Sequence, residues 1–332
     1  MAAETRFIGQ RKNGTIALGA QDNKSTSDHV IIRLGTRGSP LALYQANLVR
    51  RLLLSHWQWP DAAIEIVIIE TSGDRILDRP LYDVGGKGLF IKAIEEALLD
   101  NRVDIAVHSM KDVPSVLDEG LDIAAILERE DPRDALIAPN ISALLDLPQG
   151  TVFGTSSPRR RAQLRRLRPD LIIQDLRGNV DTRLSKVRDG VVQATILAAA
   201  GLNRLGKISA AACLVPIEQM LPAAAQGAIG VEIRADDDRA RSWLAPINHT
   251  ASAIAAHAER AVLAALGGSC VTPVAAHATI QGDQLKISAM LSSLDGMEIT
   301  EANDTGSVND FLRIGREVGE RLGRNAPAGS LS

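Results

Sequence analysis

Lys111 and Asp112 stand side by side where an apolar run ends, in the segment VDIAVHSMKDVPS (residues 103–115). Adjacent opposite charges most often form a solvated ion pair on a loop. In an open α/β sheet, however, ligands bind beyond the carboxyl ends of the strands, so this pair would point into a binding site. Asp112 is then a candidate acid, and Lys111 beside it would stay protonated and bind an anion.

Basic and hydroxyl side chains also occur where other predicted strands end. Arginine offers planar, two-pronged hydrogen bonding to carboxylate or phosphate, and helix N-termini such as those at Ser39 and Ser157 add backbone donors. Two such walls across a cleft would bind a small, polar ligand with several negative charges. The candidate binding residues are Arg37, Ser39, Ser157, Arg159, Arg160, Arg177, Arg183 and Arg204, with Lys87 in the stretch VGGKGLF as a further candidate carboxylate contact.

The basic stretch SPRRRAQLRRLRP (residues 157–169) has two interpretations. Arg159 and Arg160 lie in the first turn of a predicted helix, where cations oppose the helix dipole, so we expect an anion beside them. Nucleic acid is disfavoured as that anion, because aromatic residues make up only 3% of the chain and no stacking platform accompanies the arginines. A solvated helix face is predicted for the later arginines, which are Arg161, Arg165, Arg166 and Arg168.

The spacing of glycine, cysteine and histidine residues excludes two common kinds of site. VGGKGLF lacks the spaced first glycine of a phosphate-binding loop, and Gly88 follows Lys87 where that loop needs serine or threonine. The two cysteines and six histidines show no metal-ligand spacing, so we predict no metal site. Cys213 is predicted to be a small buried residue, whereas Cys270 in LGGSCVTP is either an ordinary loop cysteine or a presented thiol.

The composition is that of an ordinary globular protein, with 332 residues, 45% hydrophobic residues and a net charge of −3. This length allows two or three domains. Residues 1–28 are polar and lack periodicity, which predicts a disordered extension; their acidic residues argue against a cleaved organellar leader. No apolar run reaches the length of a membrane helix and no secretory signal pattern is present, so we expect a cytoplasmic protein without a membrane partner.

Short apolar runs alternate with helical patterns from Val30 onward, which indicates βα units and a mostly parallel sheet. The charged segment EREDPRDALIA (residues 128–138) is predicted to cross between two such domains. From Thr250 a helix, short strands around the turn Gly282-Asp283 and a last helix predict a small α+β domain. The predicted fold class is therefore α/β, with two α/β domains around a cleft (29–127 with 228–245, and 133–221) and a small α+β C-terminal domain (250–332).

A series of segments resembles, in order, the signature segments of the porphobilinogen deaminase family. They are TRGSPLALYQA, LYDVGGKGLFIKAIEEALL, DIAVHSMKDVPS, EREDPRDALI, GTSSPRRRAQL, LRGNVDTRLSKV, LAAAGLNRLG and LPAAAQGAIGVE. The match runs from about Ile31 to the cysteine loop. The resemblance implies a periplasmic-binding-protein-like pair of α/β domains and a third domain that carries a covalent dipyrromethane cofactor, whose attachment cysteine matches Cys270.

The resemblance also implies a transferase that joins four porphobilinogen molecules head to tail, with loss of ammonia at each step, to give hydroxymethylbilane for haem biosynthesis. The catalytic carboxylate of the family falls on Asp112, which would assist protonation of the leaving group, stabilise positive charge near the pyrrole nitrogen and help remove the final ring proton. The acetate and propionate arms of cofactor and substrate would be the anions that the basic set binds, Lys87 and Lys111 included.

The family resemblance further implies a monomer that passes its product to uroporphyrinogen-III synthase. Asp83 stands where family members often carry lysine, and Gly267 and Ser269 depart from the usual cysteine loop. Two other classes of protein remain as alternatives. A solute-binding protein would share the two-domain cleft but would lack an export signal and give Cys270 no role, and a nucleic-acid-binding protein would use residues 159–168.

Overall fold

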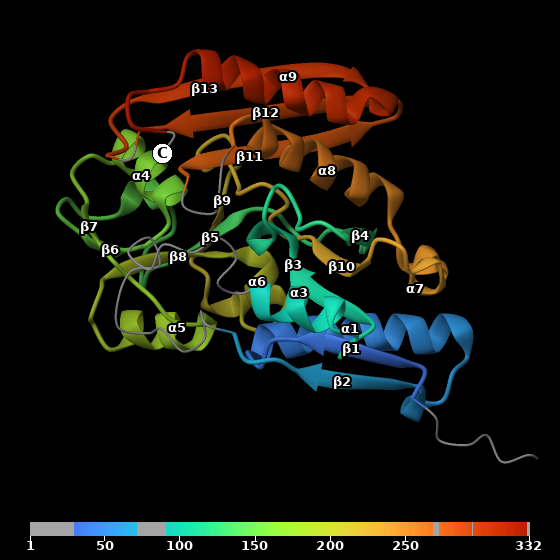
Figure 1. Ribbon diagram of the computed structural model, residues 1–332. Helices are drawn as coiled ribbons and strands as arrows, with labels where there is room; N and C mark the ends of the chain where they lie inside the picture. Colours follow the sequence, from blue (N-terminus) through green and yellow to red (C-terminus); the bar gives the residue numbers. More distant parts are fainter. Residues whose placement is uncertain (1–29, 72–90, 268–271, 294, 331–332) are drawn as a thin grey trace, which may run out of the picture.

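The computed structural model describes residues 30–71, 91–267, 272–293 and 295–330. Within these ranges the chain forms three β-sheets, each with helices packed on it (Figure 1). The predicted α/β fold class with a small α+β unit at the C-terminal end is confirmed, while the exact domain boundaries stay predictions. No helix in the described ranges combines the length and the apolar composition needed to cross a membrane.

The first sheet has the strand order β2-β1-β3-β10-β4. The first three of these strands are parallel, whereas β10 runs antiparallel to both its neighbours. Because β10 follows the whole second sheet in the sequence, the chain leaves the first sheet after β4 and later returns to it between β3 and β4. The strands are β1 (Ile32–Thr36), β2 (Ile64–Ile68), β3 (Ile105–Ser109), β4 (Leu121–Ile126) and β10 (Ile229–Arg234).

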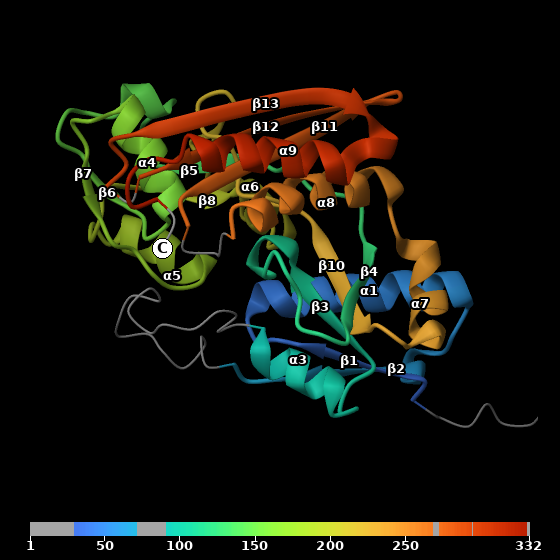
Figure 2. The same ribbon diagram turned by 45° about the horizontal axis from the view of Figure 1, so that its top comes forward.

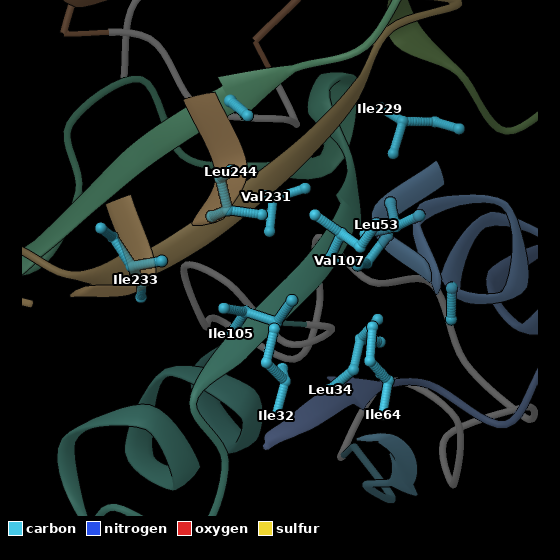
Figure 3. Close-up of a cluster of buried hydrophobic side chains, with 14 of the residues drawn as sticks. Ile32, Leu34, Leu53, Ile64, Ile105, Val107, Ile229, Val231, Ile233 and Leu244 are labelled. Carbon is cyan, nitrogen blue, oxygen red and sulfur yellow. The ribbon is translucent and has the colours of Figure 1, made fainter. Parts of the chain in front are cut away.

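Helices cover both faces of the first sheet. α1 (Pro40–Trp57) and α7 (Asp238–Leu244) share one apolar core with the strands, and α3 (Lys92–Leu99) packs on the other face. Side chains two apart on a strand share a face, which explains why alternate strand residues enter the first core. Figure 3 shows part of it, contributed by Ile32, Leu34, Ile105, Val107, Ile229, Val231 and Leu244.

The second sheet repeats the arrangement of the first, with the order β7-β6-β8-β5-β9 and an antiparallel strand, β5, between β8 and β9. Residues 128–138, predicted to be a crossing, are a crossing only in their first half, because Asp134–Ile137 form β5. All four residues of β5 are buried, which a solvent-exposed crossing would not allow. The other strands are β6 (Val152–Gly154), β7 (Ile172–Gln174), β8 (Ala194–Ala198) and β9 (Cys213–Val215).

Three helices pack on the second sheet, namely α4 (Pro158–Leu167), α5 (Val180–Arg188) and α6 (Ala199–Arg204). α1 and α4 begin as predicted, since the Ser39 and Ser157 hydroxyl oxygens accept hydrogen bonds from backbone N–H groups of the first turn. Short 3-10 helices complete the described chain at Asp61–Ala63, Met110–Asp112, Leu144–Asp146, Ile208–Ala210, Ala245–Ile247 and Val308–Asp310.

The two segments that join the first sheet to the second lie side by side. The Glu130 N–H donates to the Gly227 carbonyl at 3.2 Å, and the Arg129 Nε donates to the Gln226 carbonyl at 2.8 Å. Gly227 has a φ of 91°, and a side chain there would collide with the Glu130 carbonyl. Only glycine therefore fits this crossing.

The third sheet consists of β11 (Val274–Gln281), β12 (Gln284–Ser292) and β13 (Ile299–Ser307). The predicted turn Gly282-Asp283 joins its first two strands. α8 (Thr250–Ala265) and α9 (Phe311–Arg324) cover one face of the sheet (Figure 2). The two helices approach closely because Gly315 and Gly319 of α9 face the backbone of α8.

Replacing Gly315 with alanine is expected to destabilise this third unit by about 1–3 kcal/mol, a typical cost of overpacking. The added methyl group would overlap the Ala258 carbonyl of α8. Gly323→Ala is the matched control on the same helix, because its methyl group would meet only the Leu266 side chain at an ordinary 3.5 Å. Urea denaturation of both variants tests this expectation, and equal stability of the two would contradict it.

The three tryptophans of the chain meet at the outer end of the first sheet, where α1 ends and α7 lies. The Trp57 Nε1 donates to the Trp243 carbonyl at 3.0 Å. The Trp59 ring lies 5.8 Å from that of Trp57 and 5.9 Å from that of Trp243, and Arg239 packs over the Trp243 ring. This aromatic cluster belongs wholly to the first sheet and its helices.

Candidate active site

Lys111 and Asp112 lie in a 3-10 turn (Met110–Asp112) that directly follows β3. The Met110 N–H donates to the Ala228 carbonyl at 3.0 Å, and its side chain is buried against Gly230, where any other residue would displace the thioether. The buried methionine therefore anchors the turn and leaves its next two residues half-buried at the surface of the first unit. No hydrogen bond to another described residue occupies the Asp112 carboxylate.

Asp112 lines a small pocket of about 70 Å³ together with Arg37 and Ser39 from the loop after β1. Two parallel strands thus deliver these residues to one edge of the sheet, as the sequence predicts. The Gln45 Nε2 donates to the Ser109 hydroxyl at 2.8 Å and fixes the floor of the pocket. The structure therefore brings the candidate acid and two of the candidate anion-binding residues together.

A buried polar group, which sequence reasoning missed, lies behind this pocket. His108 Nε2 is 3.0 Å from the Glu232 carboxylate on the neighbouring strand β10, and both side chains are almost inaccessible to solvent. Burial, reinforced by Glu232, raises the pKa of Glu95 on α3 to about 7. The signal for Glu232 was a lone carboxylate inside the apolar strand IGVEIR.

Arg159 and Arg160, at the start of α4, bind a protein carboxylate. The Arg159 Nη2 and Arg160 Nη2 each donate to the Asp134 side chain at 2.7 Å, and all three side chains are buried. Burial alone would raise the pKa of Asp134, but the two guanidinium groups lower it well below its usual range. The anion expected beside the first turn of this helix is thus Asp134, while contact with a ligand carboxylate stays a prediction for both arginines.

Arg177 and Arg183 form, with Arg160, a cluster of positive charge on the second unit. Burial, together with the nearby cations Arg160 and Arg177, lowers the pKa of Arg183 to about 10, and Asp112 acts in the opposite direction. The Arg183 Nε donates to the Gly178 carbonyl at 2.8 Å, which fixes its position at the start of α5. Asp112 of the first unit and Arg183 of the second unit are therefore close enough to act on each other electrostatically.

Lys111 of the first unit is also close to the arginines of the second unit. Burial lowers the pKa of Lys111 to about 8, while Asp112 raises it and Arg160 lowers it. A pKa of about 8 keeps this lysine mostly protonated at neutral pH. The charged groups of the turn after β3 and the arginines of the second sheet therefore influence one another's pKa values, and an anion can bind between them.

Arg204 contacts one of the segments that join the two large sheets. Its Nη2 donates to the Gly227 carbonyl at 2.6 Å, and the neighbouring Asn203 donates to Glu130 at 3.0 Å. Both contacts fall on the segments that join the two large sheets. A carboxylate-binding role for Arg204 stays a prediction, and the described contact is with the crossing. Lys87 and Cys270 lie outside the described residues, as do Asp83 and Ser269.

The outer arginines of α4 are mostly paired with carboxylates of the protein. Arg161 binds Asp175 at 2.6 Å, and Arg166 binds Glu301 of the third sheet. The prediction of a solvated face is wrong for Arg168, whose side chain is only 12% exposed and caps backbone carbonyls such as that of Leu147. Such internal pairing leaves little of this stretch for nucleic-acid phosphates.

Glu259 of α8 ties the third unit to the crossing segments. This buried carboxylate accepts hydrogen bonds from both Nη atoms of Arg129 and from the backbone N–H groups of Ala225 and Ala278. Burial opposes ionisation of Glu259, but Arg129 and His277 lower its pKa below the usual value. A charged pair inside the otherwise apolar helix sequence AAHAERAVLAAL was the signal that could have revealed this junction.

Comparisons with known proteins agree along almost the whole described chain. Residues 32–242 match the family profile described as "Porphobilinogen deaminase, dipyromethane cofactor binding domain", and residues 253–324 match "Porphobilinogen deaminase, C-terminal domain". A porphobilinogen deaminase of Paracoccus denitrificans is 52% identical over 298 residues, covering 90% of this chain and 95% of the relative. One from Syntrophobacter fumaroxidans is 48% identical over 292 residues, covering 88% and 94%.

Solved structures give a more distant similarity. A putative methionine-binding lipoprotein from Bacillus subtilis is 13% identical, covers 66% of this chain and 90% of its own, and has a TM-score of 0.41. A periplasmic substrate-binding protein of an ABC transporter from Coxiella burnetii is 15% identical, covers 67% and 94%, and also has a TM-score of 0.41.

Proposed function

This chain belongs to the porphobilinogen deaminase family, and we propose that Asp112 catalyses the stepwise condensation of four porphobilinogen molecules on a dipyrromethane primer attached to Cys270. The observation that carries this proposal is the position of the Asp112 carboxylate, which lines a pocket with Arg37 and Ser39 and is close enough to Arg183 of the second unit to raise the pKa of that arginine. A carboxylate opposite a cluster of cations suits a substrate that is both a carboxylic acid and a source of transient positive charge.

The described residues fit a dipyrromethane with several carboxylates. Arg160 and Arg177 lie close enough to Arg183 for their charges to lower its pKa, so a bound polyanion would relieve the mutual repulsion of the three arginines. We propose that these arginines and Lys111, with Arg37, Ser39, Lys87, Ser157, Arg159 and Arg204, hold cofactor and substrate carboxylates. When bound, the dipyrromethane supplies the pyrrole carbon to which the next unit is joined.

Asp112 has three tasks in this reaction. In its protonated form it assists departure of the amino group as ammonia, and as a carboxylate it then stabilises the positive charge on the pyrrole ring left behind. After the new carbon–carbon bond forms, the carboxylate accepts the proton that the ring loses. Lys111, which is mostly protonated at neutral pH, holds a substrate carboxylate and so orients the pyrrole toward Asp112.

The intact mass of the denatured protein tests the function and the attachment site together. We expect the wild-type chain to exceed its polypeptide mass by two linked pyrrole units, and Cys270→Ala to show no excess. Cys213→Ala is the matched control, because Cys213 is the other cysteine of the chain and lies at the edge strand β9, so its mass excess is expected to persist. A wild-type chain that stays at its bare mass after incubation with porphobilinogen would contradict the proposal.

We propose a cytoplasmic monomer that releases hydroxymethylbilane and passes it to uroporphyrinogen-III synthase. The family membership supports this setting, because the proposed product is a linear tetrapyrrole whose onward conversion needs a separate ring-closing enzyme. Light scattering at working concentration tests the monomeric state.

A further inference from the structure

Arg260 reaches from the third unit to the chain directly behind Asp112. It lies on α8, it is 8% exposed, and its Nη1 donates to the Val113 carbonyl at 3.0 Å. Its Nη2 donates to the Pro114 carbonyl at 2.7 Å. These carbonyls belong to the two residues that follow Asp112. A single guanidinium therefore binds the chain immediately after the catalytic turn.

The charge of Arg260 is part of the same buried system. Burial lowers the pKa of Arg260 to about 10, and Glu232 is the carboxylate that opposes this shift. Glu232 in turn contacts His108 at 3.0 Å, one residue before the end of β3. The chain before the Asp112 turn therefore contacts β10 through His108 and Glu232, and the chain after the turn contacts α8 through Arg260.

The Val113 carbonyl is buried and the Pro114 carbonyl is partly buried, and a planar fork of N–H groups can supply a hydrogen bond to each at once. Val113 is almost completely buried, so water is a poor substitute for the guanidinium at its carbonyl. Without Arg260, the turn would keep its anchor at Met110 but lose the contact that fixes the residue after Asp112. A shift of the turn would move the Asp112 carboxylate relative to the facing arginines.

We infer that Arg260 is a positioning residue that locks the Asp112 turn to α8, the helix that precedes Cys270 in the sequence. The inference rests on the proposed function, in which Asp112 must stay aligned with a primer carried by the third unit. The Arg260 guanidinium donates to the backbone carbonyls of Val113, Pro114 and, at 3.5 Å, Ser115, and so acts on the Asp112 turn through the backbone.

Arg260→Met tests the inference, because methionine keeps an apolar stem and removes the guanidinium. We expect kcat for porphobilinogen consumption to fall about tenfold to a hundredfold, since misplacing a catalytic group by about 1 Å can cost that much. KM is expected to change less than threefold, because the cationic residues of the two walls are untouched. The covalent mass excess is expected to remain.

Arg234→Met is the matched control. The Arg234 Nη1 also donates to two backbone carbonyls, those of Leu98 and Val103, both at 2.9 Å, but at the far end of β10 from the catalytic turn. Both variants are expected to lose similar thermal stability, and only Arg260→Met is expected to lose turnover. Arg260→Lys, which keeps the charge without the fork, is the second variant should the methionine protein not fold. Its kcat is expected to lie above that of Arg260→Met but more than twofold below that of Arg234→Met.

A kcat for Arg260→Met or Arg260→Lys within twofold of that for Arg234→Met would overturn the positioning role. Failure of the proposed function has a different signature, because the wild-type protein would then consume no porphobilinogen at all. A fall in kcat with a KM raised in proportion would also overturn the inference, since it would place Arg260 in substrate binding.

Discussion

Asp112→Asn is expected to lower turnover by about 10²–10⁴-fold, the range that a positioned acid–base group contributes. Asparagine has nearly the same shape as aspartate, so the turn and the pocket with Arg37 and Ser39 stay in place. The amide can neither give up nor accept a proton, and it carries no charge to stabilise a cationic pyrrole. Loss of rate with the fold and the covalent mass excess retained would identify the carboxylate chemistry itself.

Glu119→Gln is the control for this substitution, because it removes an exposed carboxylate a few residues further along the same loop. Its turnover is expected to match the wild type. Steady-state rates of porphobilinogen consumption for the two variants, with circular dichroism to check the fold, make the comparison. Near-wild-type turnover of Asp112→Asn would show that the carboxylate has another role.

Asp134→Asn is expected to reduce the free energy of unfolding by about 3–5 kcal/mol, the usual cost of breaking a buried ion pair by removing one partner. Asp134 is completely buried and binds Arg159, Arg160 and the Gln226 side chain. Its replacement leaves two buried guanidinium groups without their counter-charge. Urea denaturation of the wild type and the variant measures the difference.

Asp175→Asn provides the control for Asp134, because Asp175 also pairs with an arginine of α4 but is 45% exposed. A loss below about 1 kcal/mol is expected there. The pKa of Asp134 is depressed in the folded protein, so its contribution is present above the unfolded pKa of about 3.9 and lost as pH falls. The stability gap between wild type and Asp134→Asn should therefore narrow on acidification, and a constant gap would contradict an electrostatic origin.

Local signals in the sequence predicted much of the fold. Ser39-Pro40 and Ser157-Pro158 start helices because the hydroxyl caps and the proline ring each act within one turn. β5 was missed because its four residues follow a charged, proline-containing stretch, and only pairing with β8 and β9 makes them a strand. Such pairing joins residues far apart in sequence, which a local pattern does not record.

The candidate site likewise contains residues whose positions the sequence predicts and residues whose positions it does not predict. The positions of Asp112, Arg37 and Ser39 were predictable, because the carboxyl ends of parallel strands share an edge of the sheet. The buried groups around the site were not predictable, because their contacts span more than 20 residues of sequence. Asp134 binds Arg159 and Arg160, Glu232 contacts His108, and Arg260 binds the carbonyl of Val113 from another unit. Arg159 and Arg160 show the consequence, because the predicted anion exists but belongs to the protein.

The aromatic cluster at the outer end of the first sheet determines which part of this protein intrinsic tryptophan fluorescence can monitor. All three indole rings lie there, and the second and third sheets contain none. Intrinsic tryptophan emission is therefore a local probe of the first sheet. It does not report unfolding of the third sheet and its two helices. An unfolding curve recorded by emission and one recorded by far-ultraviolet circular dichroism describe different parts of the molecule, and only their coincidence would establish that the three units unfold together.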